Sequence, residues 1–333
     1  MLKDEILLTL SSNPKEFTSG EDISDKLGIS RAAVWKYIKT LREEGYVIES
    51  YSRKGYKLIS SPNIFSVEGL KSSLVNNSLI KEILHYNTID STNDFCKNSS
   101  DTLKDGTLVL AETQTQGRGR FNRPWFSPKG TGIFCSIFLK PKLSPYDISK
   151  ITSIICASIA KTLIDMNIPI SVKWPNDIYL DGKKLGGILT EMKCDMDEIN
   201  YLIIGFGLNI NQSKEDFPGD IDKIALSLKS YFNHDFSREE ILVSILNNFE
   251  YFYKALLNNS ESKEAFQIIK DNSYVLNKEV IILKGKESIT GKVVDLGENG
   301  ELLLDINGKI EQIYSGEVSL RVKSQVPPAQ PEA

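Results

Sequence analysis

The segment "QTQGRGRFNRPW" (114–125) combines glycine and arginine residues in a way that suits the binding of an anion. A loop of this kind offers backbone amides, and arginine makes bidentate contacts with carboxylate or phosphate. Gly117 and Gly119 would open a dinucleotide-binding G-x-G-x-x-G sequence, but Asn122 stands where the third glycine belongs. A solvated basic loop is the alternative. The segment therefore predicts an anion site without identifying the anion.

Two further segments could act on the same ligand. "DSTND" (90–94) places hydroxyl and amide side chains at the expected start of a helix, where free backbone N–H groups can receive a polar or anionic ligand. A plain helix N-cap would use the same residues. "VKWPND" (172–177) places Lys173 at the end of a strand, directly before a Pro-Asn-Asp turn. Lys173 is thus expected to project from a rigid strand end and not from a flexible loop, so its ammonium group would be held in a defined place.

Composition limits the classes of protein to which the chain can belong. Its 333 residues suit two or three domains. The longest apolar runs are strand-sized, whereas a membrane helix needs roughly 20 residues, and the N-terminus lacks the marks of a signal peptide. The four cysteines are far apart and the two histidines isolated, so core thiols are expected, without a zinc site or a Ser/His/Asp triad. We expect a cytoplasmic protein with no membrane partner.

The N-terminal sixty residues have the pattern of a winged helix-turn-helix. Helices are expected over 2–11, 19–28 and 30–46, the last with Val34, Ile38 and Leu41 facing inward. Two short strands over 46–59 would flank a basic turn. The side chains expected to meet DNA are those on the exposed face of the last helix and on the wing, namely Ser30, Arg31, Ala32, Lys36, Lys39, Arg53 and Lys54. The alternative is a small helical dimerisation module with a solvated charged face.

The rest of the chain predicts an α+β protein of several domains. After a polar linker at 60–64, helices and strands alternate irregularly to about residue 272, which favours a mixed sheet over a doubly wound fold. Short strands with Gly and Asn turns then indicate a small β-barrel. The expected domains are a DNA-binding domain at 1–60, a catalytic domain at 61–272, a barrel at 273–323 and a disordered tail at 324–333.

Taken together, these segments resemble the biotin protein ligases, and with the helix-turn-helix they resemble the bifunctional ligases that also repress the biotin operon. The resemblance lies in "SGEDISDKLGISRAAVWKYIKTLREEGY", "IDSTND", "AETQTQGRGRFNRPWFSPKGTGIFCSIFLKP", "VKWPNDIYLDGKKLGGILTE" and "IGFGLNIN", which cover roughly residues 1–320 in the family's order. It implies a central biotin/lipoate ligase-like domain with a mixed sheet and a C-terminal SH3-like β-barrel.

The resemblance also implies a reaction. Biotin and MgATP would give biotinyl-5′-AMP and pyrophosphate, and a lysine of a biotin carboxyl carrier protein, from acetyl-CoA carboxylase or another biotin-dependent carboxylase, would then accept biotin. The adenylate would act as corepressor for a homodimer on operator DNA. No protein nucleophile is needed, because the carboxylate of biotin attacks the α-phosphorus and the enzyme aligns two anions. No side chain is assigned to the Mg²⁺.

Residue roles follow from the same resemblance. Lys173, Arg118 and Arg120 would be catalytic. The biotin site would be formed by Ser91, Thr92, Asn93, Gln114, Gly117, Arg118, Gly119, Arg120, Lys173, Gly187, Gly205 and Gly207. The glycines at 187, 205 and 207 have a rival explanation as tight turns. The adenylate site would be formed by Arg118, Arg120, Arg123, Trp125, Lys173, Asn176 and Asn209, with Trp125 stacking on adenine.

Two departures from the family pattern and three alternative functions remain. Within 211–228 only "ALSL" aligns, so the contacts of that stretch with adenine are unassigned, and Phe121 stands where some relatives have a basic residue. The first alternative is a ligase whose winged helix no longer acts as a repressor. The second is a transcription factor that only binds biotin, which would not need Arg118, Arg120 and Lys173. The third is a lipoate ligase.

Overall fold

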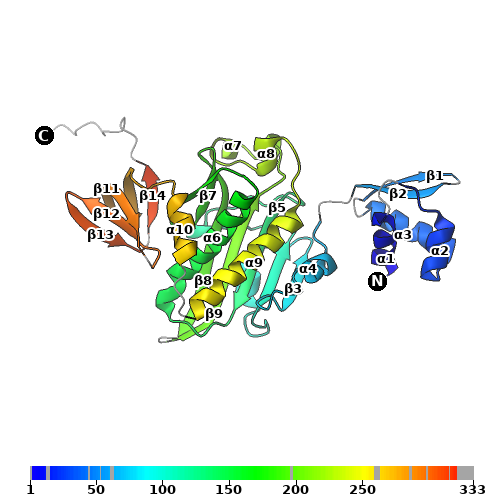
Figure 1. Ribbon diagram of the computed structural model, residues 1–333, viewed down its shortest axis with the longest axis horizontal. Helices are drawn as coiled ribbons and strands as arrows, with labels where there is room; N and C mark the ends of the chain where they lie inside the picture. Colours follow the sequence, from blue (N-terminus) through cyan, green and yellow to red (C-terminus); the bar gives the residue numbers. More distant parts are fainter. Residues whose placement is uncertain are drawn as a thin grey trace. The chain divides into compact units, whose positions relative to one another are not determined.

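The computed structural model describes residues 2–12, 16–43, 46–52, 54–60, 64–195, 198–258, 263–284, 287–297, 299–314 and 316–320. Arg53 and the expected tail at 324–333 lie outside these ranges. The chain divides into two units, Met1–Ile64 and Phe65–Ala333 (Figure 1). Among the described residues, no helix has both the length and the apolar character needed to cross a membrane.

The first unit is a winged helix-turn-helix, as predicted. The side chain of Ser19 accepts a hydrogen bond from the Asp22 N–H to begin the second helix, and Gly28 ends it at φ 64°, in the left-handed region that glycine adopts freely. The third helix ends at Glu43 and not at 46, because the Tyr46 N–H bonds back to the Leu41 carbonyl. The elements are α1 (Leu2–Ser11), α2 (Gly20–Leu27), α3 (Arg31–Glu43), β1 (Val47–Tyr51) and β2 (Gly55–Ser60).

Apolar spacing explains this unit's core. Val34, Ile38 and Leu41 are buried on one face of α3, and they pack with Ile6 of α1 and Ile23 of α2. The antiparallel pair β1 and β2 forms the wing. The opposite face of α3 is left exposed, which is the arrangement that a recognition helix requires.

The second unit is built on a seven-stranded mixed sheet. The strand order is β3-β4-β5-β9-β8-β7-β6. Among the pairings of the described strands in this sheet, that of β3 with β4 is parallel and the others are antiparallel. The mixed sheet confirms the predicted fold class, although β3 was not foreseen. The strands are β3 (Glu82–Tyr86), β4 (Thr107–Ala111), β5 (Gly132–Leu139), β6 (Ile170–Lys173), β7 (Asp177–Leu180), β8 (Lys183–Asp195) and β9 (Glu198–Asn209).

Helices cover both faces of this sheet. The long helices α6 and α9 lie side by side across one face (Figure 1), where they pack on Leu108 and Leu110 of β4. Val109 points the other way and packs against Cys96 of α5. The helices are α4 (Val67–Ser73), α5 (Thr92–Asn98), α6 (Ile148–Asp165), α7 (Ile221–Ile224), α8 (Leu228–Phe232), α9 (Arg238–Leu257) and α10 (Lys263–Asp271), with short 3₁₀ turns at Arg120–Asn122, Pro145–Asp147 and Lys214–Asp216.

The C-terminal strands form one antiparallel sheet that docks on the rest of the second unit. The order is β13-β12-β11-β10-β14, which fits the small barrel that was predicted, with β13 and β14 as the edges among the described pairings. Trp174 enters the core of this sheet, and its indole N–H donates to the Gly300 carbonyl at 2.8 Å. The strands are β10 (Glu279–Lys284), β11 (Glu287–Leu296), β12 (Leu302–Ile306), β13 (Lys309–Ile313) and β14 (Glu317–Leu320).

A buried ion pair fixes the start of the second unit. The Arg238 guanidinium donates to the Glu112 carboxylate at 2.8 Å and to the Gly132 carbonyl at 2.7 Å, and both side chains are almost fully enclosed. The same carboxylate accepts the Phe65 N–H at 2.8 Å and lies 2.9 Å from the Nε2 of His85. Burial alone would raise the pKa of Glu112, but the contact with His85 and the charge of Arg238 hold the pKa below its usual value.

Replacing Glu112 by Gln should therefore destabilise the second unit by about 3–5 kcal/mol, because the Arg238 charge would stay buried without a counter-charge. Urea unfolding measures this change. The Glu112 contribution is present above the usual carboxyl pKa of about 4.3 and should be lost as the pH falls through the lower folded-state pKa.

The control for this measurement is Asp220→Asn, which removes an exposed ion pair with Lys223. It should leave the urea midpoint unchanged, because exposed pairs contribute little. Equal effects of the two substitutions would contradict the assignment of Glu112 to a structural role.

Candidate active site

A cavity of about 370 Å³ collects almost all of the predicted ligand residues. It is bounded by the start of α5, the loop 114–126, the ends of β6 to β9, and the segment 217–225. Of the predicted residues, Gly117 alone does not line it. Those that do are Ser91, Thr92, Asn93, Gln114, Arg118, Gly119, Arg120, Arg123, Trp125, Lys173, Asn176, Gly187, Gly205, Gly207 and Asn209.

The start of α5 forms a polar end of the cavity. Ser91 is the N-cap and accepts the Asp94 N–H, so the plain capping role is real. Thr92 and Asn93 are nevertheless buried beside the cavity. The Gln114 side chain accepts the Thr92 N–H at 2.8 Å, and the Ser136 hydroxyl donates to the Asn93 carbonyl oxygen at 2.6 Å. These bonds fix the orientation of both amides at the cavity wall.

Two glycines of β9 leave room for the side chains above the sheet. A Cβ at Gly205 would lie 1.9 Å from the Asn93 side-chain oxygen, and one at Gly207 would lie 2.5 Å from the Trp125 indole nitrogen. Both glycines lie inside a strand, paired with Ser136 and Phe134 of β5, so the alternative of tight turns is wrong for them. Their role in the structure is to admit Asn93 and Trp125 to the cavity.

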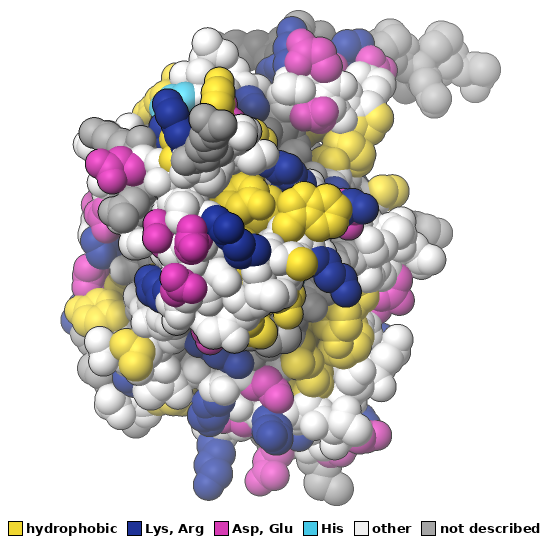
Figure 2. Space-filling view, turned by 90° about the vertical axis from the view of Figure 1, so that its right-hand side faces the viewer, with side chains coloured by type: hydrophobic (Ala, Val, Ile, Leu, Met, Phe, Trp, Pro, Cys, Tyr) yellow, Lys and Arg dark blue, Asp and Glu magenta, His cyan; other side chains and the backbone are white. Residues whose placement is uncertain are grey.

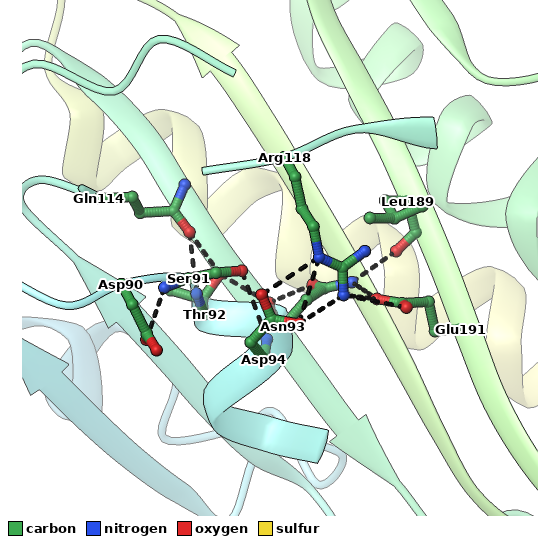
Figure 3. A network of polar contacts seen from close by, with 10 residues as sticks. Asp90, Ser91, Thr92, Asn93, Asp94, Gln114, Arg118, Leu189 and Glu191 are labelled. Atoms are coloured by element: carbon green, nitrogen blue, oxygen red, sulfur yellow. Dashed lines mark hydrogen bonds and ion pairs between the residues drawn. The ribbon is translucent and has the colours of Figure 1, made fainter. Parts of the chain in front are cut away.

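Arg118 crosses from the loop to α5 and β8 and meets two carboxylates (Figure 3). Its guanidinium donates to Asp94 at 2.6 Å and to Glu191 at 2.9 Å. Glu191 also accepts from the Asn93 amide at 2.7 Å. The hydrogen bond from Arg118 is the main cause that holds the pKa of Asp94 below its usual value. Sequence reasoning predicted Arg118 but neither of its acidic partners.

The other two arginines of the loop reach toward the C-terminal sheet. Arg120 donates to the Asn176 side-chain oxygen at 3.2 Å and to the Gly316 carbonyl at 3.1 Å, and burial lowers its pKa. Arg123 forms a two-pronged ion pair with Glu317, at 2.6 and 2.8 Å. The loop is thus attached at both ends, and Glu317 itself lines the cavity.

Lys173 ends β6 at the cavity, as the sequence predicted. Its ammonium group lies 3.3 Å from the Tyr179 hydroxyl and over the Tyr179 ring. Burial raises the pKa of Tyr179 to about 12, so the hydroxyl stays protonated. No carboxylate lies within 4.0 Å of the Lys173 ammonium in the described part of the chain. The lysine therefore brings a positive charge to the cavity that an anion can meet.

The far end of the cavity is aromatic and apolar. Lys184 pairs with Asp177 at 2.7 Å and lies over the Trp125 ring. The buried indole N–H of Trp125 has no hydrogen-bond partner among the described residues. The segment left unassigned by the sequence supplies apolar lining, namely Phe217, Ile221, Ile224 and Ala225. The spacing of Phe217, Ile221 and Ile224 at i, i+4 and i+7 is the signal that could have predicted this wall.

Asn209 at the end of β9 is occupied by contacts within the protein. Its amide donates to the Leu226 carbonyl at 3.1 Å and accepts from the Gln212 side chain at 3.3 Å. Asn209 lines the cavity, and its bond to Leu226 holds the end of the neighbouring segment 217–225 in place.

The winged unit presents basic and aromatic side chains together. Ser30 caps α3 by accepting the Ala33 N–H, and Arg31 pairs with Glu21 on the exposed surface at 3.1 Å. Trp35, which was not predicted as a site residue, is 58 % exposed and lies under the Lys39 ammonium. Figure 2 shows Lys and Arg side chains interspersed with exposed hydrophobic ones. Ala32, Lys36 and Lys39 are exposed as expected, and so is Lys54 on the wing.

Three family models match successive parts of the chain. Residues 3–57 match a helix-turn-helix domain, residues 86–209 the biotin/lipoate A/B protein ligase family, and residues 275–321 the biotin protein ligase C-terminal domain. Full-length relatives match as well. The chain is 35 % identical over 327 residues to the bifunctional ligase/repressor BirA of Bacillus subtilis, covering 96 % of this chain and 98 % of that one. The corresponding protein of Escherichia coli is 30 % identical, with 95 % and 96 % covered.

A solved structure is also similar to a large part of the chain. The biotin protein ligase from Aquifex aeolicus in complex with biotin and ATP superposes with a TM-score of 0.63 at 32 % identity, and the match covers 73 % of this chain and 99 % of that one.

The glycine at 205 gives a direct test of the geometry. Gly205→Ala should lower the free energy of unfolding by about 1–3 kcal/mol, because the new methyl group must displace the Asn93 amide. Gly119→Ala is the matched control, since its Cβ would meet nothing closer than the Arg123 carbonyl at 3.9 Å. Thermal unfolding compares the two variants, and the geometry would be contradicted by a Gly205→Ala protein as stable as Gly119→Ala.

Proposed function

Because the chain belongs to the family of bifunctional biotin protein ligases and repressors, we propose that it makes biotinyl-5′-AMP from biotin and ATP and passes biotin to a lysine of a carrier protein. The observation that carries this proposal is the joint presence of Arg120 and Lys173 in one cavity, between a polar end and an aromatic end. The carrier protein would be the biotin carboxyl carrier of acetyl-CoA carboxylase or of a related carboxylase.

The polar end fits biotin. Ser91, Thr92 and Asn93 offer hydroxyl and amide groups, and Gly205 leaves the space in which the Asn93 amide lies at the cavity wall. Buried polar groups of this kind discriminate strongly against ligands that leave them unpaired. This is the reason to prefer biotin, with its polar ring, over lipoate, whose dithiolane ring has no N–H group to donate.

The middle of the cavity fits the reacting groups. The biotin carboxylate must approach the α-phosphorus of ATP, form the new C–O–P link and release pyrophosphate. Both partners are anions, so the barrier falls when fixed positive charges stabilise them together. We assign that work to Lys173 and Arg120, whose charged groups have neutral partners in the structure: the Tyr179 hydroxyl for Lys173, and the Asn176 amide and Gly316 carbonyl oxygens for Arg120.

The aromatic end fits adenine. Trp125 offers a ring face for stacking, and Phe217 and Ile224 complete an apolar wall. Mg²⁺ would enter with ATP, since it prefers phosphate oxygens and one or two carboxylates. Asp177 is a carboxylate in the cavity, and no group of three or more metal-binding side chains occurs in the described ranges. The phosphates and Asp177 would therefore hold the metal, which would neutralise charge on the departing pyrophosphate.

The winged unit would make the protein a repressor. The exposed face of α3 carries basic side chains suited to the major groove, and a homodimer would align two such helices on a palindromic operator. Biotinyl-5′-AMP would be the corepressor. The alternative is a ligase whose winged helix no longer binds an operator.

The family matches at 3–57, 86–209 and 275–321 support the domain boundaries 1–60, 61–272 and 273–323. A ligase that also binds operator DNA would work in the cytoplasm.

Biotin-dependent exchange of pyrophosphate into ATP tests the ligase, with lipoate as the control ligand. We expect exchange with biotin at least about a hundredfold faster than with lipoate, since unpaired buried polar groups reject the wrong ligand. Exchange with lipoate alone would replace the proposed activity by lipoate ligation.

Lys173→Ala should slow adenylate formation by about 10²–10³-fold, because a charge contact made to the transition state is lost. Single-turnover formation of biotinyl-5′-AMP measures this rate. The control is Lys161→Ala, since Lys161 of α6 does not line the cavity and forms an ion pair with Asp165. A Lys173→Ala rate within about threefold of the control would remove Lys173 from the reaction.

Operator binding should depend on the adenylate and on α3. An operator can be selected from random-sequence DNA in the presence of biotin and ATP, and binding to it can be followed by anisotropy. Lys36→Ala should reduce the log–log salt slope by about 0.9 if Lys36 contacts one phosphate. Biotinyl-5′-AMP should tighten DNA binding, and the operator should tighten adenylate binding by the same factor. If the selection gives no bound DNA sequence and the protein still ligates biotin, the ligase-only alternative is favoured.

A further inference from the structure

Arg118 and Arg120 stand two residues apart in one loop but have partners of different kinds. Arg118 lies between the carboxylates of Asp94 and Glu191, at 2.6 and 2.9 Å. Arg120 donates to two uncharged oxygens and lies over the Phe121 ring, and within the described ranges no carboxylate lies within 4.0 Å of its guanidinium. The two side chains therefore cannot have the same function, although the sequence assigned both of them to catalysis.

The charge balance around Arg118 argues against its binding of an anion. One guanidinium faces two carboxylates, so the cluster carries a net negative charge. Its Nε and Nη2 groups already donate to Asp94 and Glu191. A phosphate that approached Arg118 would have to displace a carboxylate or accept repulsion from it. Around Arg120, the hydrogen-bond acceptors are neutral and the nearby carboxylates of Asp177 and Glu317 act on its charge without a direct contact, so the guanidinium is available to an anion.

Glu191 links the loop to the polar end of the cavity. One of its oxygens accepts from both Arg118 and the Asn93 amide, at 2.9 and 2.7 Å. Asn93 in turn accepts from Ser136, and Gly205 provides the space in which the Asn93 amide lies. In Figure 3 these contacts form one connected group between the loop, α5 and β8. A shift of Glu191 would therefore displace the loop and the biotin end together.

We propose that Glu191 and Asp94 are positioning residues that hold the loop over the biotin end through Arg118. Of the two arginines in the GRGR sequence, Arg120 then supplies the charge at the carboxylate–phosphate junction. This inference rests on the proposed function. It assigns a role to Glu191 and Asp94, neither of which was predicted as a site residue. It predicts that loss of Glu191 weakens the binding of biotin and leaves the chemical step largely unchanged.

A double-mutant cycle in the pyrophosphate exchange assay tests this division. Glu191→Gln should raise the KM for biotin by about tenfold with a change in kcat of less than about threefold. Arg120→Gln should lower kcat by about 10²-fold. In an Arg118→Gln background, Glu191→Gln should have a much smaller effect, because the contact with Arg118 is already broken and the contact with the Asn93 amide remains. In an Arg120→Gln background, the effect of Glu191→Gln should be retained in full.

The control variant is Glu198→Gln, which alters an exposed glutamate at the start of β9. It should leave both kinetic parameters unchanged. Independent effects of Glu191→Gln and Arg118→Gln, or a fall in kcat for Glu191→Gln as large as for Arg120→Gln, would overturn the assignment.

A second readout does not depend on activity. Phe121, in the middle of the loop, is 69 % exposed and is a site for chymotrypsin. Cleavage after Phe121 in the ligand-free protein should be several-fold faster for Glu191→Gln than for the wild type or Glu198→Gln, because the loop has lost its anchor. Equal cleavage rates would contradict the anchoring role, whatever the exchange assay shows. An absence of biotin-dependent exchange in the wild type would reject the proposed function, and the cleavage test of the anchor would still stand.

Discussion

The cavity exists because one face of β9 has no side chains at its centre. Gly205 and Gly207 are two residues apart and point to the same side of the sheet, while Ile204 and Leu208 point into the core below α6 and α9. Gly187 of β8 pairs with Gly207 and extends the bare surface. Asn93 and Trp125 then occupy the space that the glycines leave. The polar end and the aromatic end of the site both depend on this one gap in the packing.

The C-terminal strands form a sheet of their own, and this sheet also contributes residues to the site. Trp174 stands next to Lys173 and is buried in the core of that sheet, so the position of the lysine depends on how the sheet docks. Gly316 and Glu317 receive the loop's second and third arginines. Contacts from both sides therefore determine the shape of the reaction centre.

Local patterns allowed much of the site to be predicted from the sequence. The cap at Ser91, the strand that ends at Lys173 and the apolar face of α3 depend on neighbours within a few residues. The partners of Arg118 could not be predicted, because Asp94 and Glu191 are 24 and 73 residues away in the sequence. Many carboxylates in the chain could have paired with it, and only the folded sheet selects these two. The strand β3 was missed because its five residues give too little periodicity. The segment 217–225 was missed although Phe217, Ile221 and Ile224 recur at helical spacing.

The contacts of Glu112 have an evolutionary consequence. Its carboxylate serves a backbone amide at Phe65, an imidazole at His85 and a guanidinium at Arg238, and these belong to three separate parts of the chain. A change of Glu112, His85 or Arg238 alone leaves the other side chains mismatched, whereas any residue but proline keeps the backbone amide at position 65. The side chains of this group can be replaced only together, because the effect of each substitution depends on the others. The group is therefore epistatic. Relatives should therefore either keep the whole set or have replaced it as a block.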